Sequence, residues 1–148
     1  MKLLIIGTGY VGLVTGTCFA EMGHTVTCLD IDEAKIEGLK EGVIPIYEPG
    51  LEELVLKNAK GGRLHFTTNY EEGLKGAEVA FIAVPTGSLE DGTCDLSHVK
   101  SAAQSIGQHM SQDIVIVNKS TSPLHTTKTI REIITCELEK RGAHLTFH

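Results

Sequence analysis

The chain has 148 residues, and its 13 basic against 19 acidic side chains give a formal net charge of −6. This length fits one domain with a single buried core. An acidic chain without a basic run is a poor partner for nucleic acid or an anionic membrane surface, and no apolar stretch approaches the roughly 18 residues that span a bilayer. We therefore expect neither nucleic acid nor a membrane as a partner.

The first 12 residues combine an apolar strand with a glycine turn. The uninterrupted apolar run over residues 3–6 is typical of a parallel strand covered on both faces. Gly7, Gly9 and Gly12 follow in G-x-G-x-x-G spacing, which provides a tight bend, room for a pyrophosphate and close packing of a helix on the strand, in that order. The helix that follows points free N–H groups and its positive dipole end at the phosphates.

The expected helix after the glycines carries Val11, Val14, Cys18 and Met22 at helical spacing. We expect this stripe to pack on the sheet. Cys18, and Cys28 in the next strand, are then small buried hydrophobes.

The second predicted strand, residues 25–29, ends in Asp30, which lies 18 residues after Gly12. That spacing places the carboxylate to accept hydrogen bonds from an adenosine ribose. A lone glycine motif is a weak signal, but here it stands between a strand and a helix with the acidic residue in place, so dinucleotide binding is favoured over a glycine turn without a ligand. Lys35 follows on the first turn of a helix capped by Asp32, as a phosphate or ribose contact or as an ordinary solvated lysine.

Helices and strands alternate through the rest of the chain. We expect helices over residues 32–41, 51–57, 69–73, 95–110 and 123–138, and strands over residues 64–66, 79–84, 114–117 and 145–147. With right-handed crossovers this pattern predicts an α/β fold: a Rossmann-type doubly wound parallel sheet of six strands in the order 3-2-1-4-5-6, in a single domain spanning residues 1–148.

In that order the crevice opens where the winding reverses, so the carboxyl ends of the first, fourth and fifth strands face one ligand. Gly9, Tyr10 and Val11 converge there with Thr86 and Thr121. We favour the two threonines as ligand contacts. The alternative is that they only cap the helices that follow.

The four cysteines show neither C-x-x-C spacing nor a nearby histidine pair. This argues against a zinc site and against a disulfide framework. Reduced thiols of a cytoplasmic protein are the simpler interpretation. We expect Cys94 to be the only exposed cysteine and Cys136 to lie off the buried face of the last helix.

With these residues in view, the sequence resembles the UDP-glucose/GDP-mannose dehydrogenase family of nucleotide-sugar dehydrogenases. The resemblance implies an NAD-dependent double oxidation of UDP-glucose to UDP-glucuronate, which uses two NAD molecules and a cysteine that holds the aldehyde as a thiohemiacetal. The matching motifs, in chain order, are GTGYVG at 7–12, LDID at 29–32, Lys35, PIYEPGLEEL at 45–54, FIAVPT at 81–86, DGTCDLS at 91–97 and NKST at 118–121.

The resemblance also implies roles for individual residues. Thr121 corresponds to the family's KST threonine, which holds a catalytic water, and Thr86 to a threonine that contacts the cofactor. Lys35 corresponds to a basic residue near the adenosine ribose. The sequence departs from the family at Gly87, where proline is usual, and at His125, which replaces a small residue at a helix start.

The family's helical connector, its catalytic lysine and asparagine and its nucleophilic cysteine lie beyond the sixth strand, and no cysteine of this chain matches the last of these. We therefore expect an isolated NAD-binding domain that binds cofactor without turnover and is monomeric, from a homodimeric parent enzyme acting on UDP-glucose. Two alternatives stay open: the domain of a GDP-mannose or other nucleotide-sugar dehydrogenase, and a stand-alone module that senses NAD or NADH.

Overall fold

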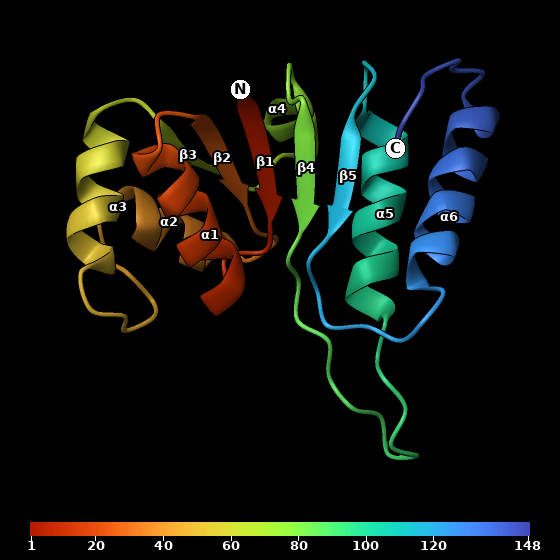
Figure 1. Cartoon of the computed structure of the whole chain (residues 1–148), viewed down its shortest axis with the longest axis horizontal. Helices are drawn as coiled ribbons and strands as arrows, with labels where there is room; N and C mark the ends of the chain where they lie inside the picture. Colours follow the sequence, from red (N-terminus) through yellow and green to blue (C-terminus); the bar gives the residue numbers. More distant parts are fainter.

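A computed structural model describes all residues, 1–148. The chain forms one parallel sheet with helices between its strands (Figure 1). None of the helices is both long enough and apolar enough to cross a bilayer. In chain order the elements are β1 (Lys2–Ile6), α1 (Tyr10–Glu21), β2 (Thr25–Leu29), α2 (Glu33–Lys40), α3 (Leu51–Lys60), β3 (Leu64–Thr67), α4 (Tyr70–Leu74), β4 (Val79–Ile82), α5 (Ser97–His109), β5 (Val115–Asn118) and α6 (Thr126–Lys140).

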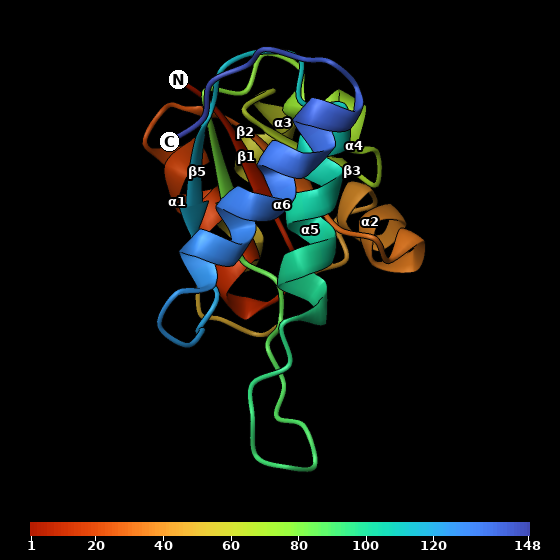
Figure 2. The ribbon, with the colours of Figure 1, turned by 90° about the vertical axis from the view of Figure 1, so that its right-hand side faces the viewer.

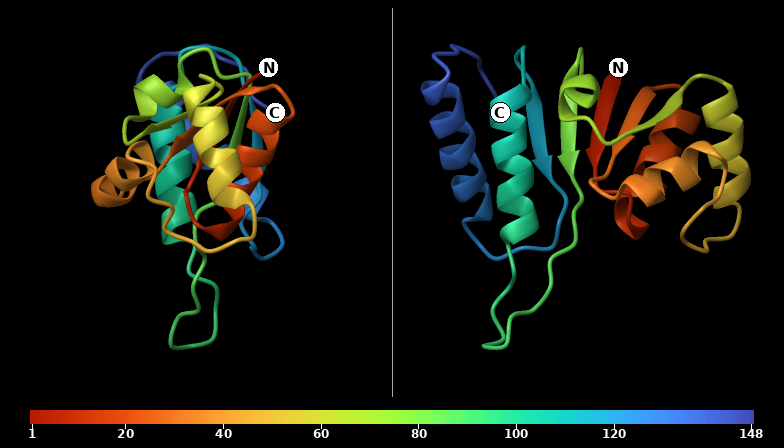
Figure 3. Two further views of the ribbon diagram at one scale, coloured as in Figure 1. Left: turned by 90° about the vertical axis from the view of Figure 1, so that its left-hand side faces the viewer. Right: turned by 180° about the vertical axis from the view of Figure 1, so that it is seen from behind.

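The sheet has five strands in the order β3-β2-β1-β4-β5, with β1 in the middle. Alternate residues of β1 serve opposite faces: Leu4 and Ile6 join the core formed with α4, α5 and α6, whereas Leu3 and Ile5 join the core formed with α1, α2 and α3. None of the four is more than 3% exposed. Figure 2 shows α5 and α6 on the side of the sheet opposite α1, and Figure 3 shows α3 beside α1. The doubly wound arrangement predicted from the sequence is confirmed.

The sixth strand expected over residues 145–147 is not formed, so the six-strand prediction is corrected to five. Phe147 makes only an isolated parallel bridge to Ile114, and the Ile116 N–H donates to the carbonyl of His148 at 2.7 Å. The segment thus lies along the outer edge of β5, where the expected order places a sixth strand. A single bridge does not make the run of successive pairs that defines a strand of the sheet.

The stripe predicted to pack α1 on the sheet was wrong for three of its four residues, and only Val14 packs against the core. Val11 is 50% and Met22 72% exposed, and Cys18 is exposed as well. The face on the sheet consists of smaller residues because the helix approaches closely: a Cβ on Gly16 would lie 2.6 Å from the Cys28 sulfur. The buried residues of α1 are Gly12, Leu13, Gly16, Thr17 and Ala20.

The cysteines divide differently from the prediction. Cys28 is fully buried, as expected, and burial raises the pKa of its thiol to about 12. Cys94 is half-buried, with its sulfur 4.0 Å from the Thr121 carbonyl oxygen, and Cys136 is exposed. The expectation that Cys94 is the only exposed cysteine was therefore wrong. All four thiols are free.

The close approach of α1 to the sheet leads to a stability prediction. We expect Gly16→Ala to lower the free energy of unfolding by about 1–2 kcal/mol, because overpacking against Cys28 outweighs the gain of about 1 kcal/mol in helix propensity. Gly38→Ala in α2 is the matched control, because its Cβ would come no nearer than 3.8 Å to any neighbour. Urea unfolding measures both, and equal stabilisation by the two substitutions would contradict the packing argument.

Candidate functional site

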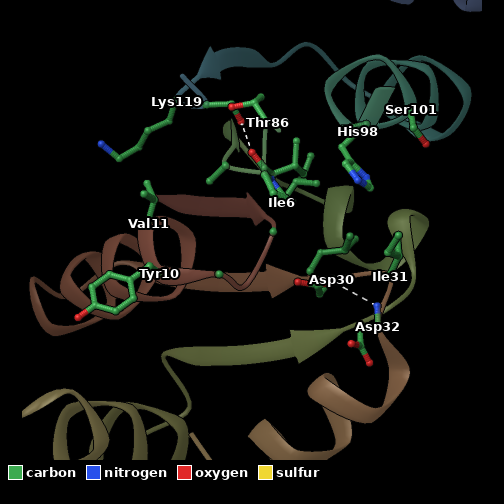
Figure 4. A pocket seen from close by; sticks show the side chains of 18 of the residues that line it. Ile6, Tyr10, Val11, Asp30, Ile31, Asp32, Thr86, His98, Ser101 and Lys119 are labelled. Atoms are coloured by element: carbon green, nitrogen blue, oxygen red, sulfur yellow. Dashed lines mark hydrogen bonds between the residues drawn. The ribbon is translucent and has the colours of Figure 1, made fainter. Parts of the chain in front are cut away.

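The carboxyl ends of the central strands open onto a cleft of about 520 Å³ (Figure 4). Residues from the tips of β1, β2, β4 and β5 line it, together with residues of α4 and α5. Gly12 does not line the cleft and is buried behind the glycine turn. The other residues predicted for the site all line it: Gly7, Gly9, Tyr10, Val11, Asp30, Lys35, Thr86 and Thr121.

The three motif glycines have distinct surroundings. Gly7 has a φ of +103°, a left-handed conformation that only glycine adopts at little cost. A Cβ on Gly12 would lie 1.9 Å from the Gly7 carbonyl oxygen, so α1 and the turn touch backbone to backbone. Gly9 has no atom within 4 Å of the position a Cβ would take, so open space lies over the turn at the cleft wall.

The first turn of α1 presents backbone donors to that space. Gly9 is the N-cap and offers no side-chain hydrogen bond, and the first turn carries no acidic residue. The N–H groups of Tyr10, Val11 and Gly12 precede the first intrahelical bond, which runs from the Leu13 N–H to the Gly9 carbonyl at 2.9 Å. Unpaired donors at the positive end of a 12-residue helix, facing a gap without side chains, fit a pyrophosphate.

Asp30 is held in place at the tip of β2. Its Oδ2 accepts hydrogen bonds from the Thr8 N–H at 2.8 Å and the Thr8 hydroxyl at 2.7 Å, and Lys35 Nζ lies 3.3 Å away. The Asp32 N–H donates to Oδ1 at 3.2 Å. Burial acts to raise the pKa of Asp30, but the bonds from Thr8 and Asp32 and the charge of Lys35 together hold that pKa below its ordinary value. Lys35 therefore faces the cleft and is not an isolated solvated lysine.

The tips of β4 and β5 are joined by hydrogen bonds. The Lys119 and Ser120 N–H groups both donate to the Ile82 carbonyl, at 2.8 and 3.0 Å, and the Ser120 hydroxyl donates to the Val84 carbonyl at 2.7 Å. Neither predicted threonine caps a helix, since the N-caps of α5 and α6 are Leu96 and His125. The capping alternative for the two threonines is therefore not realised.

The glycine turn is also tied to the loop before α3. The Tyr10 hydroxyl contacts the Tyr47 carbonyl at 3.0 Å and the Glu48 carboxylate. The hydrogen bond to Glu48 is the main cause of a raised pKa of Tyr10. The side chain of Tyr10 is thus turned to this loop, whereas the backbone of the same residue lies beside the open space over Gly9.

Sequence reasoning missed several cleft residues. Tyr70 of α4 and His98 and Ser101 of α5 line the wall near Asp30, and Figure 4 shows His98 and Ser101 on the side opposite Val11 and Lys119. These residues lie on helix faces that carry no motif. Thr8 was missed as well, although its position between two motif glycines could have drawn attention to it. Burial raises the pKa of Tyr70.

These features define a dinucleotide-binding domain: a doubly wound sheet, a glycine turn before a helix, a carboxylate at the next strand tip and a cleft at the point where the winding reverses. Over residues 1–148 the sequence matches the UDP-glucose/GDP-mannose dehydrogenase family, NAD binding domain. The chain belongs to this family and forms its NAD-binding domain.

Sequence relatives support this family assignment. The chain is 53% identical over 133 residues to the UDP-glucose 6-dehydrogenase TuaD of Bacillus subtilis. This match covers 90% of this chain and 29% of TuaD. It is 48% identical over 141 residues to the UDP-glucose 6-dehydrogenase of Pseudomonas aeruginosa, covering 95% of this chain and 31% of that enzyme. The chain therefore spans about a third of the length of these relatives.

Solved structures have the same fold. A UDP-glucose dehydrogenase from Pyrobaculum islandicum superposes with a TM-score of 0.90 at 34% identity, covering 99% of this chain and 34% of that one. GDP-mannose dehydrogenase from Pseudomonas aeruginosa, solved as a ternary complex, gives a TM-score of 0.89 at 31% identity, covering 100% and 35%. This chain thus shares its fold with about a third of each of these two dehydrogenases.

The lowered pKa of Asp30 leads to a prediction about acid stability. Folding lowers the pKa of Asp30 below its value in the unfolded chain, which is about 3.9. The carboxylate therefore stabilises the native state at pH values above about 3.9, and this contribution to the free energy of unfolding is lost as the pH falls through the lower pKa of the folded state. The difference in free energy of unfolding between the wild type and Asp30→Asn should be constant above about pH 5 and shrink below about pH 4. Urea unfolding across this range measures it, and a difference independent of pH would contradict the assigned contacts.

Proposed function

We propose that this chain is the NAD-binding domain of a UDP-glucose 6-dehydrogenase, an oxidoreductase that converts UDP-glucose to UDP-glucuronate with two NAD molecules. The observation that carries the proposal is the convergence of the α1 N-terminus, Asp30, Thr86 and Thr121 on one cleft. Identities of 53% and 48% to UDP-glucose 6-dehydrogenases support the choice of substrate.

Each part of the cleft has a task in this proposal. The N–H groups at the start of α1 hold the pyrophosphate, and Asp30 accepts a hydrogen bond from the adenosine ribose. Thr86 and Thr121, at the tips of β4 and β5, serve the nicotinamide end, where Thr121 positions a water. When bound, NAD supplies the hydride acceptor.

The domain alone binds NAD and does not turn over. Covalent trapping of an aldehyde needs an accessible, activated thiolate. Cys28 is fully buried with a pKa of about 12, and none of Cys18, Cys94 and Cys136 lines the cleft. The nucleophile of the reaction therefore belongs to another part of the parent enzyme.

The proposed location and assembly of the parent enzyme rest on the family resemblance and on the thiols. We place a homodimeric parent in the cytoplasm, in keeping with four unpaired cysteines, and the separate domain as a monomer. A GDP-mannose dehydrogenase is the second candidate, because such an enzyme superposes nearly as well. Turnover of the full-length enzyme with each sugar nucleotide distinguishes the two, and the coding sequence beyond codon 148 distinguishes both from a stand-alone NAD sensor.

The proposal predicts a preference for NAD over NADP. A 2′-phosphate would place about two negative charges against Asp30, and Lys35 is the one cation paired with that carboxylate. The loss of a charge-assisted hydrogen bond plus repulsion should cost about 2 to 3 kcal/mol, or roughly 30-fold to 150-fold in affinity. Titration of both cofactors at one ionic strength tests this preference. Asp30→Ala should weaken NAD binding and reduce the difference in affinity between NAD and NADP. Equal affinities of the unmutated domain for NAD and NADP would mean that Asp30 does not lie at the ribose.

Thr121 provides a second prediction, made for the full-length parent. Because a positioned water contributes mainly in the transition state, Thr121→Ala should lower turnover and leave NAD affinity within a few-fold. The matched control is Thr127→Ala on α6, which is exposed and outside the cleft. If Thr121→Ala instead lost cofactor binding and kept its rate at saturating NAD, Thr121 would be a cofactor ligand without a role in the chemistry.

A further inference from the structure

Thr8 stands between two motif glycines but does not line the cleft. Its side chain is fully buried, and its N–H and hydroxyl both donate to one atom, Oδ2 of Asp30, at 2.8 and 2.7 Å. The glycine turn itself places no demand on this position, because the bend is made at Gly7 and the close packing at Gly12. The hydroxyl of Thr8 thus has one visible task, which is to hold a carboxylate 22 residues away.

The two oxygens of Asp30 are occupied unequally. Oδ2 accepts three hydrogen bonds, from the N–H and the hydroxyl of Thr8 and from Lys35 Nζ at 3.3 Å, so neither of its two lone pairs is free. Oδ1 receives only the Asp32 N–H at 3.2 Å, so one of its lone pairs is left for a ligand in the cleft. A ribose cannot engage both oxygens without displacing Thr8.

We propose that Thr8 is a positioning residue: it locks Asp30 so that the carboxylate accepts one ribose hydroxyl, through Oδ1 alone, and Lys35 Nζ donates to the other. This inference rests on the proposed role of Asp30 at the adenosine ribose and refines it. An ammonium group has three donors, so Lys35 can keep its contact with Oδ2 and still reach a ligand in the cleft that it lines. The 2′-hydroxyl is the partner of Oδ1, as expected for the acidic residue of this fold.

The test compares NAD with its analogue that lacks the adenosine 2′-hydroxyl, by titrating each into the domain. The wild type should bind NAD about 10-fold to 150-fold more tightly than the analogue, the range for a hydrogen bond to a charged group. Thr8→Val keeps the shape and removes the hydroxyl, and it should reduce this ratio by about five-fold or more. Thr8→Ser restores the donor and should restore the ratio.

Thr17→Val is the matched control. Thr17 is also fully buried, and its hydroxyl donates at 2.7 Å to the Leu13 carbonyl within α1, away from Asp30. This variant should change stability without changing the ratio. In an Asp30→Asn background, Thr8→Val should have no further effect on the ratio, because the carboxylate it positions is gone.

The possible failures are distinct. A wild type that binds no NAD would overturn the proposed function. A wild type that binds NAD and its analogue equally would overturn the inference and leave the NAD domain standing. A Thr8→Val variant that keeps the wild-type ratio, or that weakens both ligands by the same factor, would reduce Thr8 to a structural residue.

Discussion

The site depends on the close approach of α1 to the end of β1. Gly12 allows it, because any side chain there would overlap the Gly7 carbonyl. The contact fixes the helix start directly beside the strand tip, so the unpaired N–H groups of the first turn face the cleft, and the open position over Gly9 leaves room for a ligand's phosphates. The contact between Gly7 and Gly12 therefore fixes the start of the helix, and Gly9 leaves the space in front of it open.

An acidic protein with a net charge of −6 holds an anionic cofactor in this arrangement. The attraction is local: it comes from backbone donors and the helix dipole, which act within the first turn. Asp30 does not oppose it, because its charge is taken up by the two donors of Thr8 and by Lys35. In the proposed binding mode this carboxylate meets only the neutral hydroxyls of the ribose, and the phosphates meet the backbone donors of α1.

Much of the fold could be read from the sequence because strand and helix periods differ and because topology decides which strand tips meet. Thr86 and Thr121 lie 35 residues apart in the chain and both line the cleft, as the strand order predicts. The packed face of α1 could not be read, since periodicity favours large apolar residues whereas this interface selects small ones, such as Gly16. The position of Thr8 between two motif glycines marks the residue, but its contact with Asp30 depends on side-chain orientation across two strands and cannot be read from the sequence. His98 lies on a helix face without a motif and leaves no signal in the sequence.

The central claim is that the first turn of α1 holds the pyrophosphate of NAD. Backbone amide chemical shifts, followed by NMR as NAD is added to the domain, test it directly. The account predicts that the largest changes fall on the N–H groups of Gly9, Tyr10, Val11 and Gly12, with smaller changes around Asp30. Changes confined to the outer edge of the sheet, around β5 and residues 145–148, with none in the glycine turn, would contradict it.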